Sequence, residues 1–223
     1  MTDTFATAPR PTHRLIPSQF PPIGLFDTVA TTADLTAVME LVGWTNDRLV
    51  AERINRLPPN EWVYGSPNSS IVMAAFLHVA PGGMRFNGPD LGAWYAAGDI
   101  RTAAAEVGHH LRREAIARGV ASMSRRYRAY VATLLGDYLD IRGQQASRPE
   151  IYASGSYAAS QPFGEQIRAS GGAGVIYDSV RLVNGTNVVA HRPRNIIDIL
   201  QTDHYEITVQ AGFRTIDARK LTT

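Results

Sequence analysis

The sequence contains no cysteine, and this absence removes several classes of protein at once. A disulfide scaffold, a zinc finger, an iron–sulfur site and a cysteine nucleophile all depend on thiols. The 223 residues must therefore fold around a hydrophobic core, which a chain of this length can bury without covalent staples. With 44% hydrophobic and 19% charged residues, the composition is that of a globular protein of one large or two small domains.

Long apolar runs are also absent. The longest run, residues 71–77, is far below the roughly 18 residues that a membrane-spanning helix needs. Residues 1–11 are polar and lack the charged start and apolar stretch of a secretory signal. We therefore expect a cytoplasmic protein that makes no use of a membrane.

Lysine is nearly absent, because Lys220 is the only lysine among 22 basic residues. The net charge of +2 is small, and a GC-rich genome explains such an arginine bias without any function. Arginine also binds phosphate through a bidentate fork that lysine lacks. A phosphate-bearing ligand is therefore the functional alternative.

Common nucleotide, hydrolase and metal signatures are missing or incomplete. The glycines at 171–174 precede a predicted strand, whereas a phosphate-binding loop precedes a helix. The sequence has no G-x-S-x-G nucleophile elbow. Glu106 and His109 have the Glu-x-x-His spacing of di-iron bundles, but such bundles need two copies and the sequence has one. We predict no metal site.

Hydrophobic periodicity predicts helices and strands without regular βαβ alternation, which favours one compact α+β domain. We expect mixed or antiparallel sheets flanked by helices, with residues 1–12 as a flexible tail and 13–223 as the domain. Asp99 caps the clearest predicted helix, over about 100–118. Further helices are predicted between 32 and 57, over 71–78 and over 160–167. Strands are predicted over 13–20, 84–87, 93–97, 125–133, 138–141, 175–180, 186–190 and 204–210, the last of these ending the fold.

The stretch from Arg125 to Tyr130 interleaves arginines with tyrosines. Such a stretch can follow a nucleic-acid backbone and stack on bases. A strand with a solvated arginine face and a buried tyrosine face has the same pattern. A nucleic-acid-binding module is therefore a functional alternative of a different class.

The segment from Met84 to Val107 brings together side chains suited to one chemistry. Arg85 lies on one predicted strand, Tyr95 on the next, and Glu106 about one and a half turns into the following helix. An arginine fork suits a diphosphate, and a tyrosine face suits a flat cationic ring. A carboxylate suits a sugar bond that breaks through an oxocarbenium ion. NAD+ contains all three parts; the alternative is a surface arginine, a core tyrosine and a solvent-facing glutamate.

Three blocks of the sequence carry a family pattern. Residues 13–27, HRLIPSQFPPIGLFD, contain an opening arginine and a short proline-containing segment. Residues 82–107 contain Gly-Gly, Arg-Phe-Asn, Ala-x-Tyr and Ala-x-x-Glu, and residues 174–193 contain Tyr-x-Ser-x-Arg and Gly-x-Asn. In order and spacing, these blocks resemble the RES-domain family, the toxin half of RES–Xre toxin–antitoxin pairs. Met84 between the glycines and Arg85 is a small departure from the family string.

The resemblance implies a fold like that of ADP-ribosyltransferases, with NAD+ consumed as a co-substrate. By position, it implies that Arg14 and Arg85 bind the NAD+ phosphates and that Tyr95 packs on the nicotinamide. It implies further that Glu106 holds the ribose and steadies the oxocarbenium ion. Ser179 is implied to hydrogen-bond the substrate in the same cleft.

The resemblance also implies a partner, an Xre-type antitoxin that covers the NAD+ cleft and provides any link to nucleic acid. The chain is longer than the family core, and the extra length lies mainly at residues 34–78, which we expect to be a helical insertion. Such an insertion beside the cleft could recognise a macromolecule, which favours transfer of ADP-ribose to a cytoplasmic protein acceptor. The predicted function is therefore that of a mono-ADP-ribosyltransferase toxin. The close alternative is an NAD+ phosphorylase or glycohydrolase, which uses the same cleft but passes ADP-ribose to phosphate or water.

Overall fold

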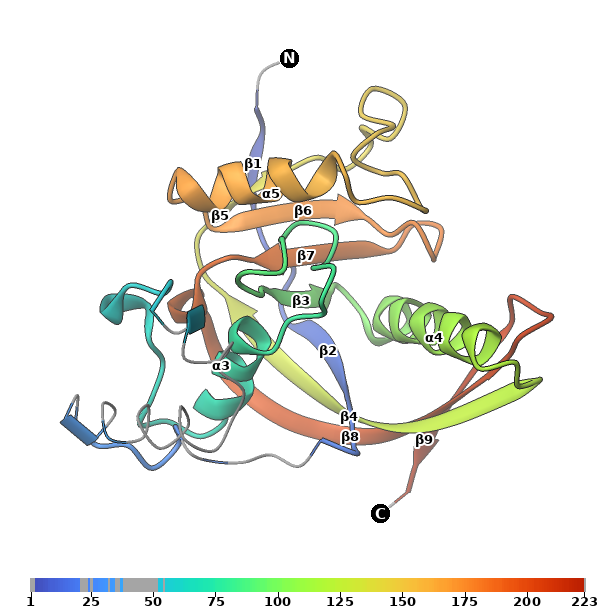
Figure 1. Ribbon diagram of the computed structural model, residues 1–223, viewed down its shortest axis with the longest axis horizontal. Helices are drawn as coiled ribbons and strands as arrows, with labels where there is room; N and C mark the ends of the chain where they lie inside the picture. Colours follow the sequence, from blue (N-terminus) through green and yellow to red (C-terminus); the bar gives the residue numbers. More distant parts are fainter. Residues whose placement is uncertain are drawn as a thin grey trace.

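The structure is a computed structural model of the chain, and it describes residues 3–20, 24, 26–31, 33, 34, 37, 52, 53 and 55–222. Within these residues, nine strands form one sheet in the order β1-β5-β6-β7-β3-β2-β4-β8-β9 (Figure 1). The β5–β6 pair is parallel, and the other neighbours are antiparallel. The strands are β1 (Phe5–Thr7), β2 (Thr12–Pro17), β3 (Trp94–Ala97), β4 (Ser122–Leu134), β5 (Asp137–Asp140), β6 (Gly174–Asp178), β7 (Thr186–Ala190), β8 (Ile196–Gln210) and β9 (Ile216–Leu221).

Three α-helices of the described chain flank this sheet: α3 (Ser69–Leu77), α4 (Ile100–Ala117) and α5 (Ser160–Ala169). Figure 1 shows α5 alongside β6, α3 near β3, and α4 above the long curved strands β4 and β8. Two short 3-10 turns, Pro59–Glu61 and Pro193–Asn195, complete the described elements. The expected α+β class, with a mixed sheet flanked by helices, is confirmed.

Helix α4 forms where the sequence predicts it. The Asp99 carboxylate accepts hydrogen bonds from the Thr102 backbone N–H at 2.9 Å and from the Thr102 hydroxyl at 2.7 Å, which caps the first turn. Small buried residues, Ala103 and Ala104 among them, allow close packing, while Leu111 anchors the helix in the core. That core includes Leu15, Tyr127, Ala129 and Ile207 from the strands below. The helix is therefore fixed along its length on the sheet.

The hairpin between β6 and β7 also forms as predicted. Asn184 and Gly185 turn the chain, and Asn184 adopts a positive φ of 62°, a conformation that asparagine tolerates better than most residues. The two strands then pair antiparallel from Asp178 opposite Thr186 to Gly174 opposite Ala190. Strand β7 also pairs with β3, so the hairpin lies beside residues 94–97.

Several sequence predictions need correction. Residues 5–7, which were assigned to a flexible tail, form β1 and pair with β5 because that strand has an open edge there. Residues 84–87 make a single bridge between Met84 and Asn87 rather than a strand. The predicted strand over 204–210 is not the last one, because its chain turns back to form β9. Residues 32, 35, 36, 38–51 and 54 lie outside the described residues, so the helices predicted between 32 and 57 fall largely outside them. The end of the predicted insertion at 34–78 is described and contains α3.

The remaining predicted elements occur close to their predicted positions. Strand β4 covers residues 122–134 rather than 125–133, and α5 covers 160–169 rather than 160–167. No helix in the described part of the chain is long and apolar enough to cross a lipid bilayer.

Candidate functional site

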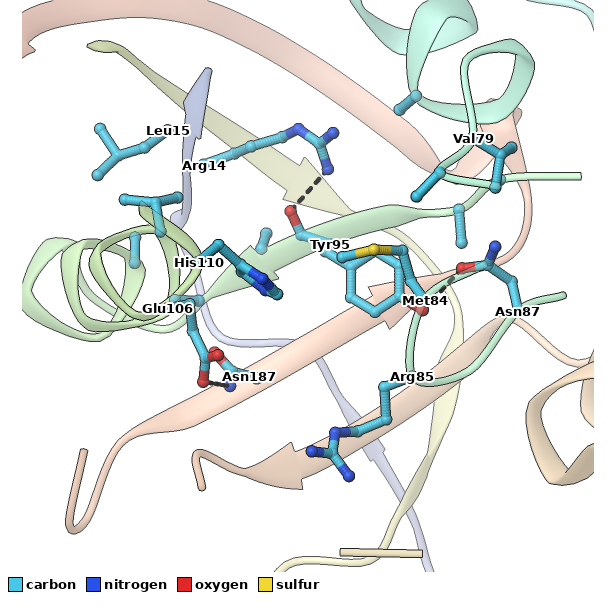
Figure 2. Close-up of a pocket in the computed structure, with 18 of the residues that line it drawn as sticks. Arg14, Leu15, Val79, Met84, Arg85, Asn87, Tyr95, Glu106, His110 and Asn187 are labelled. Carbon is cyan, nitrogen blue, oxygen red and sulfur yellow. Dashed lines mark hydrogen bonds between the residues drawn. The ribbon is translucent and has the colours of Figure 1, made fainter. Parts of the chain in front are cut away.

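A cavity of about 320 Å³ lies where β2 and β3 meet α4, the end of α3 and the loop around residue 85 (Figure 2). This volume is at the lower end of the range for small-molecule sites, roughly 300–1,000 Å³. Arg14, Arg85, Tyr95 and Glu106 all line it, so the structure brings together four of the five residues predicted for the site. Ser179 lies directly behind Glu106.

Glu106 is the acidic residue of the cavity wall, and two hydrogen bonds hold its carboxylate. The Ser179 hydroxyl donates to Oε1 at 2.7 Å, and the Asn187 side-chain amide donates to the same oxygen at 2.6 Å (Figure 2). No donor among the described residues hydrogen-bonds Oε2. The carboxylate therefore has a fixed orientation and one oxygen left for a ligand.

Ser179 acts on Glu106 rather than on the cavity itself. Its hydroxyl oxygen accepts hydrogen bonds from the backbone N–H groups of Arg181 and Leu182, both at 3.1 Å, which order the turn after β6. Its hydrogen is donated to Glu106, and the side chain is not among those that line the cavity. In contrast to the substrate contact implied by the resemblance, this geometry makes Ser179 a positioning residue for the carboxylate.

Tyr95 presents its ring to the cavity and ties down the neighbouring loop with its hydroxyl. The hydroxyl donates to Asn87 Oδ1 at 2.8 Å and accepts from the Phe86 backbone N–H at 2.9 Å. Burial raises the pKa of Tyr95, so the phenol is neutral near pH 7. An uncharged aromatic ring held in this way is a suitable surface for a flat cationic group.

Arg85 is buried, and one side of its guanidinium is hydrogen-bonded to backbone carbonyls. Its Nη1 donates to the backbone carbonyls of Ile151 at 2.9 Å and Ala153 at 3.0 Å, and its guanidinium lies 5.2 Å from the centre of the Tyr157 ring. Two carbonyls would lose their donor if Arg85 were truncated, so this residue also stabilises the 151–153 loop. The other guanidinium donors make no hydrogen bond within the described chain.

Arg14 lies on the opposite side of Tyr95, on β2. Its guanidinium lies 4.6 Å from the centre of the Trp94 ring, and its Nη1 donates to the Tyr95 backbone carbonyl at 2.9 Å. Burial lowers the pKa of Arg14 to about 10, which leaves the side chain protonated near pH 7. Its buried Nε has no hydrogen-bond partner among the described residues, and a buried cationic donor in this state is suited to an anionic ligand.

Sequence reasoning missed several residues of the cavity wall, chiefly Asn187, His110 and Arg181. Asn187 follows the predicted hairpin turn, and its role at Glu106 depends on the β3–β7 pairing. His110 lies four residues after Glu106 on α4, so helical spacing alone places it on the same face. The Tyr-x-Ser-x-Arg and Gly-x-Asn strings contain Arg181 and Asn187, so the family pattern also held a signal for these two residues.

The arginine–tyrosine stretch on β4 lies elsewhere and has structural partners. Arg125 forms a salt bridge with Glu114 at 3.0 Å, and Arg128 donates to the Phe20 carbonyl. Tyr127 and Tyr130 are 3% and 1% exposed, so their rings are not available for stacking on bases. These contacts are those of a structural strand. The described residues also contain no group of three or more His, Asp and Glu side chains placed to bind a metal ion.

Comparison with known proteins gives one family. The family model of the RES domain matches the sequence over residues 53–210, which include Arg85, Tyr95, Glu106 and Ser179. No curated protein matches the sequence. Among solved structures, the chain is similar to one in a crystal structure of the M. tuberculosis MbcT–MbcA toxin–antitoxin complex, with 16% identity and a TM-score of 0.43 over 60% of this chain and 75% of that chain. Because the family model covers well over half of the sequence, this chain belongs to the RES domain family.

Proposed function

We propose that this protein is a toxin that breaks the bond between nicotinamide and ribose in NAD+. The observation that carries the proposal is the arrangement around Glu106: an oriented carboxylate shares one cavity with the buried Arg85, the half-buried Arg14 and a neutral tyrosine ring. Each feature corresponds to one part of NAD+. The guanidinium groups suit the diphosphate, the ring suits the cationic nicotinamide, and the carboxylate suits the ribose.

The free oxygen of Glu106 supports the assignment of the chemical step. When the C1′–N bond breaks, its electron pair leaves with nicotinamide and positive charge develops on the ribose. A carboxylate that is already oriented stabilises that charge without reorganising, and such preorganised electrostatics is a large part of catalysis. Ser179 and Asn187 hold Oε1, which leaves Oε2 for a ribose hydroxyl. Arg14 and Arg85 then serve to bind rather than to react.

We propose further that the ADP-ribose passes to a protein acceptor, as the sequence analysis predicts. Support for this step comes from the expectation that residues 34–78 form a helical insertion, of which residues 35, 36, 38–51 and 54 lie outside the described residues. Phosphate and water are the competing acceptors, and all three share the same cleavage step. The three acceptors give different products, so identification of the product distinguishes between them.

The proposal includes an antitoxin as partner. The family resemblance supports an Xre-type protein, and the cavity wall supports the kind of contact that it makes. Arg14, Arg85 and Arg181 line the cavity with a single carboxylate, so an acidic segment of the partner would complement it. We expect the partner to cover the cavity and to suppress release of nicotinamide.

The test uses purified protein, free of antitoxin, and NAD+ labelled on the adenylate phosphate, with and without cell lysate. Label on one lysate protein supports transfer to a protein, and mass spectrometry then identifies the acceptor. Release of nicotinamide without labelled protein supports phosphate or water instead, and omission of phosphate separates these two. Absence of turnover under all these conditions contradicts the proposed function.

A further inference from the structure

His110 faces the same space as Glu106 but has no role in the function proposed so far. The two residues lie four positions apart on α4, one turn along the same helical face. Figure 2 shows the imidazole of His110 extending from the helix beside the Glu106 carboxylate, toward the ring of Tyr95. All three side chains line the cavity.

The imidazole is free to react. No described residue forms a hydrogen bond with either of its nitrogens, and its ring centre lies 5.5 Å from that of His109. More than a third of the His110 surface is accessible, because the side chain faces the open cavity although protein surrounds it on other sides. A ligand in the cavity can therefore reach a ring nitrogen directly.

The surroundings of His110 favour its neutral form. Burial by the surrounding protein is the main cause that lowers its pKa below the ordinary 6.5, and the positive charges of Arg181, Arg113 and Arg85 act in the same direction. The negative charge of Glu106 opposes them. Near pH 7 the neutral ring thus carries a lone pair that can accept a proton.

Glu106 is poorly suited to take that proton itself. Its negative charge stabilises the oxocarbenium ion, and protonation of the carboxylate would remove this charge while it is needed. One of its oxygens is also occupied by two donors. The reaction therefore calls for a separate base on the same side of the cavity.

We propose that His110 is the general base that takes the proton from the acceptor nucleophile. This inference rests on the proposed cleavage of NAD+. In the step, the C1′–N bond breaks and nicotinamide leaves with the electron pair. An acceptor oxygen forms a bond to C1′ and gives its proton to a ring nitrogen of His110, which becomes imidazolium and later releases the proton to solvent. The acceptor belongs to the class of groups that carry a removable proton on oxygen, such as a hydroxyl or water.

The test compares His110→Gln with His109→Gln, a matched change at the adjacent residue, which does not line the cavity. With water or an alcohol as acceptor, we expect His110→Gln to lower the rate of product formation by about 100-fold or more, as loss of a general base does. We expect His109→Gln to remain within about twofold of the unchanged protein. Stabilisation of both variants by NAD+ in a thermal unfolding assay shows that they fold and bind.

Azide separates a base from a structural role, because this anionic nucleophile has no proton to lose. We expect azide to restore the rate of His110→Gln and to yield the azido product. We also expect the unchanged protein to lose activity as the pH falls through the pKa of His110, below 6.5, and His110→Gln to lack this decline.

Full activity of His110→Gln with water or an alcohol contradicts this inference, and so does an equal loss with azide. Both results leave the cleavage of NAD+ in place. Absence of nicotinamide release from the unchanged protein overturns the proposed function and, with it, the role of His110.

Discussion

The side chains around Glu106 divide into those that face the cavity and those that hold the carboxylate. Ser179 belongs to the second group, because its hydroxyl donates to Glu106 while it accepts from two backbone N–H groups of the adjoining turn. Removing the hydroxyl takes away a hydrogen bond to a charged group, which contributes about 1.5–3 kcal/mol. Removal of the Ser179 hydroxyl should therefore alter the orientation of the Glu106 carboxylate and leave the cavity wall unchanged.

We predict that Ser179→Ala lowers the rate of nicotinamide release by about 10-fold to 100-fold, which corresponds to that hydrogen-bond energy. The affinity for NAD+ should change little, because Arg14 and Arg85 stay in place. Steady-state kinetics separates the two effects. Ser147→Ala is the matched control, since the Ser147 hydroxyl is exposed and bonds a local carbonyl. A rate for Ser179→Ala equal to that control would show that Ser179 does not position the carboxylate.

At the residue scale, the predicted strand–strand–helix order of residues 84–107 indicated that Arg85, Tyr95 and Glu106 could converge, and all three line the cavity. The contacts of Ser179 and Asn187 were not predictable in this way. They depend on how strand β7 pairs beside β3, which brings residue 187 next to Ala97 and within reach of α4. His110 was missed although its spacing from Glu106 on one helix could have placed it, and the lack of a hydrogen-bond partner for its imidazole among the described residues is visible only in the structure.

Helix α4 carries both Glu106 and His110, so its first turn matters for the site. The Asp99 carboxylate bonds two donors of Thr102 there. We predict that Asp99→Ala lowers the free energy of unfolding by about 1 kcal/mol near pH 7, the usual contribution of an N-cap. Urea unfolding measures this difference.

The same cap has a predictable dependence on pH. Partial burial raises the pKa of Asp99, but the hydrogen bonds from Thr102 outweigh it, and the net pKa lies below the ordinary 3.8. A carboxyl group whose pKa is lower in the folded state than in the unfolded state stabilises the fold when the pH is above the unfolded-state pKa. This stabilisation is lost as the pH falls through the folded-state pKa. The free energy of unfolding of the unchanged protein should therefore approach that of Asp99→Ala as the pH falls below 3.8. Asp99→Asn, a neutral cap, should not show this loss.

Helix α5 packs directly on the loop that carries Arg85. A Cβ atom added at Gly164 would lie 2.1 Å from the Phe86 carbonyl oxygen, whereas one added at Gly155 would meet nothing within 4 Å. We predict that Gly164→Ala destabilises the protein by about 1–3 kcal/mol, as overpacking does. It should also weaken binding of NAD+, because the helix must move away from the 85–87 loop.

Gly155→Ala serves as the control for this change, and we expect its free energy of unfolding to stay within about 0.5 kcal/mol of the unchanged protein. Thermal or urea unfolding of both variants gives the comparison. Equal stability of the two would mean that α5 does not pack against Phe86 as the structure has it.

At the element scale, local signals predicted α4 and the β6–β7 hairpin well. Asp99 caps the helix, and Asn184 with Gly185 forms the turn, so neighbouring residues decide both. Strand β9 was missed because most of its residues are exposed at the edge of the sheet, so no apolar alternation marks it. Strand β1 was missed for a related reason, since it has three residues and a long-range partner.

On the scale of the whole molecule, the cavity exists because distant parts of the chain become neighbours in one sheet. The order β7-β3-β2 places residues 187, 95 and 14 on adjacent strands, and α4 lies alongside with Glu106 and His110. The sequence predicts these elements one by one but not this order. The family pattern was informative because its three blocks include residues from each of these parts.

The most direct test of the central claim is release of nicotinamide from NAD+ by the purified protein, measured beside Glu106→Gln. The amide of glutamine keeps the size of the side chain but removes the charge that stabilises the oxocarbenium ion. We expect the unchanged protein to release nicotinamide and Glu106→Gln to be slower by about 100-fold or more, while NAD+ still raises the unfolding temperature of both. Equal rates in the two proteins, or no release by either, would contradict the account.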